Sequence, residues 1–350
     1  MKNKFDKIFN EFLKSNKNIN KFLKPLGSSN DGEVKEVQYK NNIYAAKLIR
    51  LDEKKKSYVE KLRGHNIIKI LEVIDKKINN QNYQLIIMEK APIRDLNILF
   101  QYIHKMNFLK LINNPFVDFI GDNIMRFFVQ QIVNGLEILE RNEFAYFDLK
   151  PDNMLISKNL ILKISDFSFL INLKETKENI KIPERTEGYL SPEFYSGKTV
   201  DAETAKKQDY FALGSSIFLL KTGEQLLKYP KSPDEKMMES RIIDLMQRDI
   251  AHIRSFPEMN RDFVDFLCNL IQYIPEERPT FEEIYRNKWL NENKEEISLI
   301  SNSYTDEEEN KLMIELIKSD FLIEKRKIVK NTKQNKCNFK FSMNKLKKNN

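Results

Sequence analysis

The sequence is poor in the residues on which disulfide-stabilised, zinc-binding and membrane-spanning proteins depend. Its 350 residues include two cysteines, Cys268 and Cys337, and three histidines. Two cysteines cannot form a disulfide framework and suit a reducing compartment, and so few Cys and His residues argue against zinc chemistry. No run of about 18 apolar residues occurs, which predicts no membrane-spanning helix. The N-terminal residues interrupt their apolar positions with Lys, Asp and Glu, which predicts no secretory signal. We therefore expect a cytoplasmic protein, with the nucleus as a second compartment.

The positive charge is concentrated at one end of the chain. Residues 325–350 contain ten basic side chains and no acidic one; removing these ten from the formal total of +8 leaves −2 for residues 1–324. A folded nucleic-acid-binding domain carries basic residues over its binding face, so the nearly neutral body argues against that class. The tail suits an anionic membrane surface or a nucleic acid, and a solvated, disordered end without a partner is the alternative.

Hydrophobic periodicity predicts a β-rich part followed by a mainly helical part. Apolar residues between 5 and 13 recur at helical spacing, which predicts an amphipathic helix packed on the following domain. The lysines around it also allow a helix that lies on a membrane surface. Apolar runs between residues 21 and 90, broken by Gly, Asn and Asp, predict antiparallel strands. After Pro92 helices are predicted at 122–142, 206–222, 235–250, 260–273 and near 281–290, with loops and strands at 144–171.

The strongest chemical signal is the segment FDLKPDN at residues 147–153. In a tight loop held by Pro151, the side chains of Asp148, Lys150 and Asn153 are expected to converge. Phosphoryl transfer needs a carboxylate that orients the attacking hydroxyl, a cation that follows the moving charge and an amide oxygen that binds a metal. Asp166 follows a strand-like run and is a second candidate ligand for a divalent metal that bridges nucleotide phosphates.

With further motifs, these residues resemble the eukaryotic protein kinase family over about residues 22–291. The motifs are a glycine-rich loop (26–34), a third-strand lysine motif (44–47), a gatekeeper and hinge (88–91), a substrate-side loop that ends in Pro-Glu (186–193), the start of a central helix (209–214) and a late arginine motif (275–280). The resemblance implies that Asp209 pins the catalytic loop and that Arg278 pairs with Glu193. Lys150 is typical of the Ser/Thr-directed branch.

The family implies an α+β, bilobal protein-kinase fold, with a small antiparallel β lobe, a larger mainly α-helical lobe and ATP in the cleft between them. It also implies ATP and Mg²⁺ as cofactors and a protein Ser or Thr hydroxyl as substrate. The implied catalytic residues are Asp148, Lys150 and Lys47, and the implied metal ligands are Asn153 and Asp166. The implied ATP contacts are Leu26, Gly27, Gly32, Val34, Ala45, Lys47, Met88, Glu89, Ala91 and Leu155.

The predicted organisation has four segments. Residues 1–19 are an N-terminal amphipathic extension, and 20–291 are the kinase domain, with its small lobe at about 20–90 and its large lobe at about 91–291. Residues 292–324 are a C-terminal helical extension, in which Thr305 and Glu308 match a capping box. Residues 325–350 are the basic tail.

Four positions depart from the family pattern. Ser29 replaces a glycine of the phosphate loop, and Ser168 replaces the glycine after Asp166-Phe167. Tyr146 and Phe147 stand where the family has His-Arg. Tyr146 is expected to stack on Phe167 and to join Val59 and Ile70 in an apolar spine. Phe147 has no charge to pair with an activation-loop phosphate, so the loop is expected to be held by apolar contacts of residues 169–171.

A further departure concerns the partner of Lys47. The family pairs this lysine with a Glu on the following helix, but the apolar residues Tyr58, Val59 and Leu62 place Lys55 at the matching position. Neither Glu53 nor Glu60 gives an amphipathic register. The sequence therefore leaves two interpretations open: an active Ser/Thr protein kinase, and a pseudokinase that acts as a nucleotide-binding scaffold. A small-molecule or lipid kinase is disfavoured, because the 186–193 motif serves peptide substrates.

The charge of the tail leads to the first prediction. Removing residues 325–350 should leave peptide phosphorylation unchanged and abolish salt-sensitive binding to anionic vesicles or RNA, because the basic charges are lost. Co-sedimentation with vesicles and RNA gel shifts at low and high salt measure both. If the full-length protein binds neither at low salt, the tail is no electrostatic tether.

Overall fold

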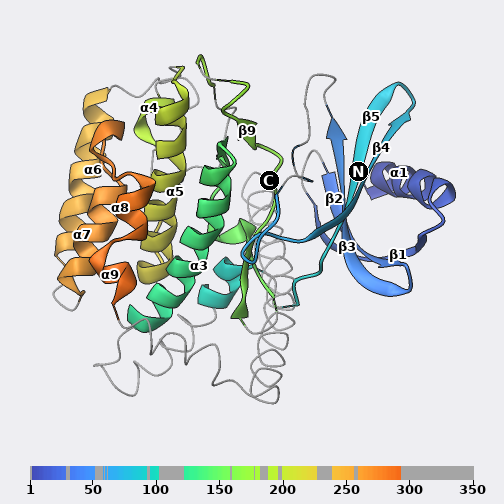
Figure 1. Ribbon diagram of the computed structural model, residues 1–350, viewed down its shortest axis with the longest axis horizontal. Coiled ribbons are helices and arrows are strands. Elements are labelled where there is room, and N and C mark those ends of the chain that lie inside the picture. The colour runs from blue at the N-terminus through green and yellow to red at the C-terminus, as the bar shows by residue number, and fades with distance from the viewer. Residues whose placement is uncertain are drawn as a thin grey trace, which may run out of the picture. The chain divides into compact units, whose positions relative to one another are not determined.

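The computed structural model describes most of the chain between residues 2 and 292 (Figure 1). The described residues are 2–28, 32–51, 58, 60, 62–92, 95–101, 122–157, 160–176, 178–181, 188–195, 199–226, 239–255 and 259–292. The helix predicted after Thr305 and the basic tail lie outside them. In this part of the chain no helix is long and apolar enough to cross a membrane.

The β-rich first part of the chain forms a five-stranded antiparallel sheet. In spatial order its strands are β1 (Ile19–Ser28), β2 (Gly32–Tyr39), β3 (Asn42–Leu51), β5 (Gln81–Met88) and β4 (Ile70–Ile78). Two-residue turns join β2 to β3 and β4 to β5. Their residues, Lys40, Asn41, Asn79 and Asn80, have φ angles between 46° and 67°. Tight hairpins need this left-handed conformation, and asparagine tolerates it well.

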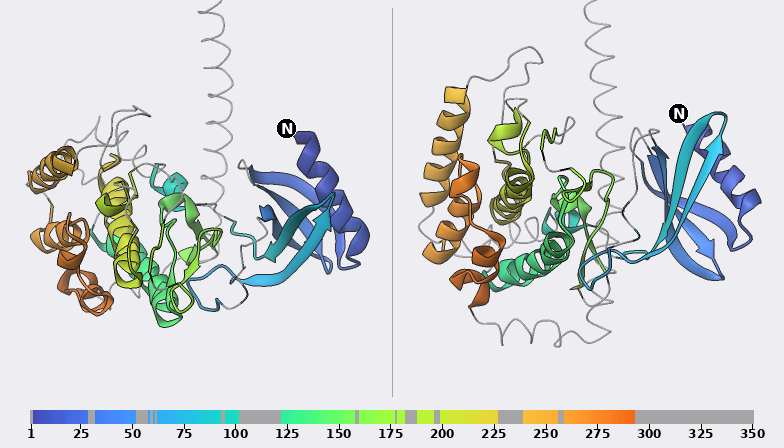
Figure 2. Two further views of the ribbon diagram at one scale, coloured as in Figure 1. Left: turned by 90° about the horizontal axis from the view of Figure 1, so that it is seen from above. Right: turned by 45° about the horizontal axis from the view of Figure 1, so that its top comes forward.

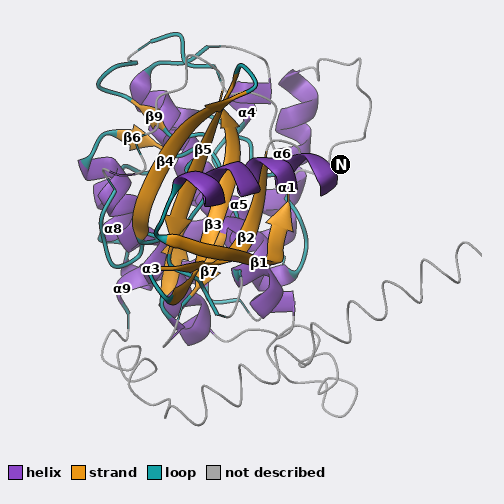
Figure 3. Cartoon of the chain, turned by 90° about the vertical axis from the view of Figure 1, so that its right-hand side faces the viewer, coloured by secondary structure: helices purple, strands orange, loops and turns teal. Residues whose placement is uncertain are grey.

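The two faces of this sheet are distinct. Helix α1 (Lys2–Ser15) lies across one face (Figure 3), where Phe9 and Phe12 are buried among apolar residues of β2, β3 and β5. Leu48 of β3 packs in this cluster, so Lys47, the adjacent residue in the strand, points to the opposite face. The apolar face of α1 is therefore buried on the domain, as the packing interpretation predicts, and is not left for a membrane surface.

Charged residues fasten α1 to the same face. Lys35 of β2 is 8% exposed, forms an ion pair with Asp6 and lies 4.5 Å above the ring of Phe9. Lys76 of β4 donates a hydrogen bond of 2.6 Å to the carbonyl oxygen of Glu11. The ammonium groups of both lysines thus lie over aromatic rings of α1 and also meet polar groups of the helix.

The second part of the chain is mainly helical. After helical residues 96–101, its described helices are α3 (Asp122–Arg141), α4 (Pro192–Tyr195), α5 (Ala202–Thr222), α6 (Glu239–Arg254), α7 (Arg261–Leu270), α8 (Phe281–Tyr285) and α9 (Lys288–Asn291). Helix α5 lies between α3 and α7 (Figure 2) and is buried on nearly every side. Because α5 has neighbours on several sides, its buried residues, which include Lys207, Gln208 and Asp209, do not fall on one apolar stripe, and the helix has no clear amphipathic pattern.

Short elements connect α3 to α4. They are β6 (Phe144–Ala145), the 3₁₀ turn η2 (Pro151–Asn153), β7 (Met154–Ile156), β8 (Leu162–Ile164) and β9 (Ile171–Asn172); a second 3₁₀ turn, η4 (Pro275–Glu277), precedes α8. β6 pairs with β9, and β7 pairs with β8. These two small sheets fix the ends of the segments that carry Asp148 and Asp166.

Capping side chains explain where the helices differ from their predicted limits. Helix α5 begins at Ala202, four residues early, because the side chain of Asp201 accepts a hydrogen bond of 2.8 Å from the amide of Thr204. The helix predicted near 281–290 is two helices, because Asn287 leaves the helical conformation and caps α9. Periodicity alone does not reveal such interruptions.

The burial of α1 gives the second prediction. Replacing Phe12, which is 0% exposed, by alanine should lower the free energy of unfolding by about 3–5 kcal/mol, because it leaves a cavity under the helix. Thermal or urea unfolding of the purified protein measures the change.

The matched control is Ile43→Ala, since Ile43 lies on β3 in the same sheet but is 45% exposed. A change at Phe12 no larger than the change at Ile43 would show that α1 does not stabilise the sheet.

Candidate active site

Strand β3 presents Lys47 on the sheet face opposite α1. Its neighbours across the sheet are Val34 of β2 and Ile86 of β5, and the next pair on this face joins Ala45 to Met88. Residues in direct register across antiparallel strands share a face. The sheet therefore brings Val34, Ala45, Lys47 and Met88, four of the residues singled out in the sequence, onto one surface.

The two described glycines of the phosphate loop differ in their surroundings. At Gly32 an added Cβ atom would lie 2.3 Å from the carbonyl oxygen of Leu48, so only glycine permits this approach of β2 to β3. At Gly27 no atom lies within 4 Å of such a Cβ, which leaves open space beside the backbone. Ser29 lies outside the described residues.

The side chains of Asp148, Lys150 and Asn153 converge, as the sequence predicts. Asp148 is 8% exposed, and one of its carboxylate oxygens accepts a hydrogen bond of 2.9 Å from Lys150 Nζ. The other accepts a hydrogen bond of 2.7 Å from Asn153 Nδ2, which also donates to the backbone carbonyl of Asp148 at 2.9 Å. Because Asn153 uses its nitrogen for these bonds, its side-chain oxygen is the atom that suits a metal ion.

Helix α5 holds this loop through Asp209. The buried carboxylate accepts hydrogen bonds from the backbone amides of Tyr146 at 2.6 Å and Phe147 at 2.8 Å. Phe147 has a φ angle of 64°, a strained value for a residue with a bulky side chain. Two charge-assisted hydrogen bonds hold the chain in this turn, as the resemblance implied for Asp209.

Tyr146 occupies the position of the family histidine, and its side chain contacts both Phe167 and Ser165. Its ring packs edge-to-face on Phe167 with 5.7 Å between the centroids, as expected. Its hydroxyl donates to the carbonyl oxygen of Ser165, a contact that the sequence did not indicate. Complete burial, with the nearby carboxylates, holds the pKa of Tyr146 well above its ordinary value, so the hydroxyl remains a donor. Of the other two spine residues, Ile70 is buried and Val59 lies outside the described residues.

Asp166 meets Lys47 across the site. The two side chains form an ion pair, and Ser168 Oγ lies 2.6 Å from the same carboxylate oxygen of Asp166 and 3.1 Å from Lys47 Nζ. Burial of the carboxyl acts to raise the pKa of Asp166, but the charge of Lys47 and the hydrogen bonds from Lys47 and Ser168 outweigh it and hold the pKa below its ordinary value. Asp166 is therefore an anion at neutral pH. Glu60, the described carboxylate on the segment after β3, is exposed to solvent.

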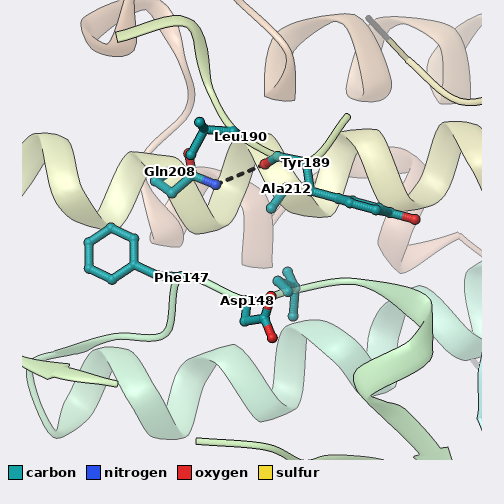
Figure 4. Close-up of a pocket in the computed structure, with 7 residues that line it drawn as sticks. Phe147, Asp148, Tyr189, Leu190, Gln208 and Ala212 are labelled. Atoms are coloured by element: carbon teal, nitrogen blue, oxygen red, sulfur yellow. Dashed lines mark hydrogen bonds between the residues drawn. The ribbon is translucent and has the colours of Figure 1, made fainter. Parts of the chain in front are cut away.

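The loop beyond Gly188 is fixed on α5. Gln208, a residue that sequence reasoning missed, accepts hydrogen bonds from the amide and hydroxyl of Ser191 at 2.7 and 2.5 Å. It donates one of 2.9 Å to the carbonyl of Tyr189 (Figure 4). A cavity of about 10 Å³, room for about one water molecule, separates this loop from Phe147 and Asp148. No sequence motif distinguishes Gln208 from other polar helix residues.

Arg278 and Glu193 form the predicted ion pair next to this loop. Two guanidinium nitrogens donate to the two carboxylate oxygens at 2.8 and 2.7 Å, and Arg278 is 1% exposed. Such a bidentate buried pair ties α4 to the segment before α8. Thr186, at the start of the substrate-side motif, lies outside the described residues.

Phe147 packs in an apolar cluster instead of presenting a charge. Its ring meets Phe194 of α4 edge-to-face at 5.9 Å between centroids. Phe169 and Ile171 pack against this cluster, as predicted, whereas Leu170 is buried outside it. A contact that the sequence did not indicate lies nearby. Tyr58 donates a hydrogen bond of 2.6 Å to Glu175, which, with burial, raises the pKa of Tyr58 to about 12.

The remaining ATP-contact candidates lie around the link between the sheet and the helical part. Leu26 is 36% exposed at the end of β1. Glu89 uses its side chain for protein contacts, accepting from the amide of Lys69 at 2.7 Å and lying 3.5 Å from Lys163 Nζ. Ala91 and Leu155 are partly buried. The Glu89 amide likewise has a partner in the protein, since it donates to the carbonyl oxygen of Lys69 at 2.9 Å.

The donor chemistry fits Mg²⁺. Asn153 offers an amide oxygen and Asp166 an ionised carboxylate, and the amide of Ser165 donates to the Asn153 carbonyl at 2.9 Å, so the two segments adjoin. Among the described residues no group of three or more His, Cys, Asp and Glu side chains could hold a metal ion. Mg²⁺ commonly takes one or two protein ligands and completes its shell with water and phosphate oxygens. A metal here would depend on the phosphates of a nucleotide.

Comparison with known proteins agrees with this geometry. Residues 21–290 match the model of the protein kinase domain. Because this match covers most of the chain, the chain belongs to the protein kinase family. The described sheet and helices have the small β part and larger helical part of that fold.

Curated relatives resemble this chain at low identity. Rhodopsin kinase of Rattus norvegicus is 28% identical over 158 residues, covering 45% of this chain and 26% of the relative. An Aurora kinase of Saccharomyces cerevisiae is 28% identical over 202 residues, covering 56% and 49%. A probable serine/threonine-protein kinase of Dictyostelium discoideum is 23% identical over 342 residues, covering 91% and 43%. The chain spans about a quarter to a half of the length of these relatives.

Proposed function

We propose that the protein is an active Ser/Thr protein kinase, which transfers the γ-phosphoryl group of ATP to a protein hydroxyl with Mg²⁺ as cofactor. The observation that carries this proposal is the convergence of five polar residues. Asp148 contacts both Lys150 and Asn153, and Lys47 contacts Asp166. A protein that only binds partners has no use for this set of groups.

In this proposal each side chain has a distinct task. Asp148 orients the substrate hydroxyl and accepts its proton, while Lys150, 2.9 Å from Asp148, neutralises charge on the moving phosphoryl group. Asn153 and Asp166 would hold Mg²⁺, which when bound would neutralise the phosphate charge. Lys47 binds the α- and β-phosphates. Phosphoryl transfer needs positioning and electrostatic stabilisation more than covalent chemistry, which this arrangement can supply.

The nucleotide is proposed to bind against the sheet face that carries Lys47. Its contacts would be Leu26, Gly27, Gly32, Val34, Ala45, Met88, Glu89, Ala91 and Leu155. The open space at Gly27 is where a phosphate could approach backbone amides. Lys150 and the substrate-side loop support a protein substrate with Ser or Thr, and the names of the relatives agree with this class.

The second candidate function is a pseudokinase that binds nucleotide as a scaffold. Two departures from the family pattern favour it: Ser29 replaces a glycine of the phosphate loop, and the sequence after β3 places no glutamate at the position expected for the partner of Lys47. The organisation into segments 1–19, 20–291, 292–324 and 325–350, a cytoplasmic location with the nucleus as alternative, and an anionic partner for the tail also remain proposals that rest on the sequence.

Paired variants separate the two functions. Asp148→Asn should preserve folding and ATP binding but lower turnover at least about 100-fold, because the hydroxyl loses its base. Asp166→Ala should instead abolish Mg²⁺-dependent nucleotide binding. Radiolabelled phosphate transfer to a mixed peptide library and calorimetric titration with Mg·ATP measure the two effects.

Asp152→Asn is the matched control, because Asp152 belongs to the same loop but is exposed and accepts a hydrogen bond of 3.1 Å from Asn97. Its turnover should stay within about twofold of wild type. Wild-type turnover no higher than the background rate would identify a pseudokinase. Measurable turnover that is equal in wild type and Asp148→Asn would show that Asp148 is not the base.

The surroundings of Phe147 indicate how the activation segment is held. Many family members pair an arginine at this position with a loop phosphate, whereas Phe147 packs on Phe194. The hydrogen bond from Tyr58 to the carboxylate of Glu175 also joins the segment after β3 to the activation segment. Both contacts form without a modification.

The fourth prediction is that activity does not require phosphorylation of the activation segment. Thr176→Ala and phosphatase-treated wild type should retain peptide-kinase activity within about twofold of untreated protein. A loss of tenfold or more, about 1.4 kcal/mol in barrier, would show that a phosphate is needed despite Phe147. Phosphatase-treated Asp148→Asn supplies the background rate.

A further inference from the structure

Ser168 replaces the glycine that follows Asp166-Phe167 in the family pattern, and the structure gives its side chain two partners. Ser168 Oγ lies 2.6 Å from a carboxylate oxygen of Asp166 and 3.1 Å from Lys47 Nζ. A hydroxyl has one proton to donate and lone pairs that accept. Lys47 is a donor only and ionised Asp166 an acceptor only, so the hydroxyl accepts from the cation and donates to the anion.

The backbone at this turn does not need glycine. The left-handed conformation belongs to Asp166, with a φ angle of 58°, and Ser168 is not among the residues with positive φ. The Ser168 amide also donates to the Asp166 carboxylate at 3.3 Å. The residue is therefore accommodated without strain, and its hydroxyl is held at a fixed place between the two charged groups.

From this geometry we infer that Ser168 is a positioning residue: its hydroxyl orients Lys47 and Asp166 toward Mg·ATP. This inference rests on the proposed nucleotide-binding function. Among the described residues the ion-pair partner of Lys47 is Asp166, and the carboxylate of Glu60 is exposed. A lysine without a second anchor has several rotatable bonds to order when it meets a phosphate.

The hydroxyl matters more in the loaded site than in the empty one. Without nucleotide, Lys47 and Asp166 contact each other directly, so removal of Ser168 Oγ leaves each with a partner. Phosphate oxygens and Mg²⁺ compete for these two charges and weaken the direct pair. A neutral group that bonds both can keep them in place without competing for either charge. Loss of the hydroxyl should therefore weaken nucleotide binding rather than folding.

Four variants test this inference. Ser168→Ala removes the hydroxyl, Ser168→Gly also restores the family residue, and Ser168→Thr keeps a hydroxyl. Ser255→Ala is the control, because Ser255 is exposed on another part of the chain and bonds only a helix carbonyl of His252 at 2.6 Å in the contacts described. Calorimetric Kd for Mg·ATP, the Mg²⁺ concentration for half-maximal binding and the thermal midpoint are measured for each, followed by KM and kcat for peptide phosphorylation.

We expect Ser168→Ala and Ser168→Gly to raise the Kd and KM for Mg·ATP about tenfold, with kcat and the thermal midpoint little changed. Ser168→Thr and Ser255→Ala should stay within about threefold of wild type. An unchanged Kd in Ser168→Ala overturns the inference, as does a Ser168→Thr variant as impaired as Ser168→Ala, since the effect would then be steric. A wild-type protein that fails to bind Mg·ATP overturns it as well.

The outcome for the proposed activity is read separately. If wild type binds Mg·ATP but transfers no phosphate, the kinase proposal fails, while the Kd values of the four variants still decide the part that Ser168 plays. If wild type transfers phosphate and Ser168→Ala binds Mg·ATP normally, the kinase proposal stands and the inference about Ser168 fails.

Discussion

The carboxylate of Asp209 is the contact on which the candidate site depends. It accepts two backbone hydrogen bonds from the residues immediately before Asp148, and it holds Phe147 at a φ angle of 64°. Because α5 is buried on nearly every side, this anchor cannot shift without disturbing the helical core. The position of Asp148, and through it those of Lys150 and Asn153, follows from a helix that begins more than fifty residues later in the chain.

Aromatic residues take over contacts that charged or polar family residues make elsewhere. Tyr146 joins the Ser165 carbonyl to the ring of Phe167, and Phe147 joins the catalytic loop to Phe194. Apolar packing is permanent, whereas a pair with phosphate exists only after modification. Burial alone can therefore order the same loop. The loop then lacks an arginine–phosphate contact that phosphorylation or dephosphorylation could form or remove.

The lysine of β3 shows where sequence reasoning was incomplete. The amphipathic register after β3 raised doubt about a Glu partner for Lys47, and most of that segment lies outside the described residues. Its described residue Tyr58 contacts Glu175. Nothing in the spacing indicated that Ser168 would reach both Lys47 and Asp166. Residues 47 and 168 are far apart in the chain, and only the packing of the sheet against the loop after β8 brings them within 3.1 Å.

The sequence by itself determined the local features. Alternating apolar residues determined the strands and the buried face of α1, and the spacing of Asp148, Lys150 and Asn153 within one short loop determined that they converge. Their chemistry depends on neighbours a few residues away, so local patterns suffice. Tertiary structure decided the limits of α5, the partners of Tyr146 and the bond of Gln208 to the substrate-side loop. These contacts join segments distant in the chain, and no local pattern encodes which distant groups a side chain will meet.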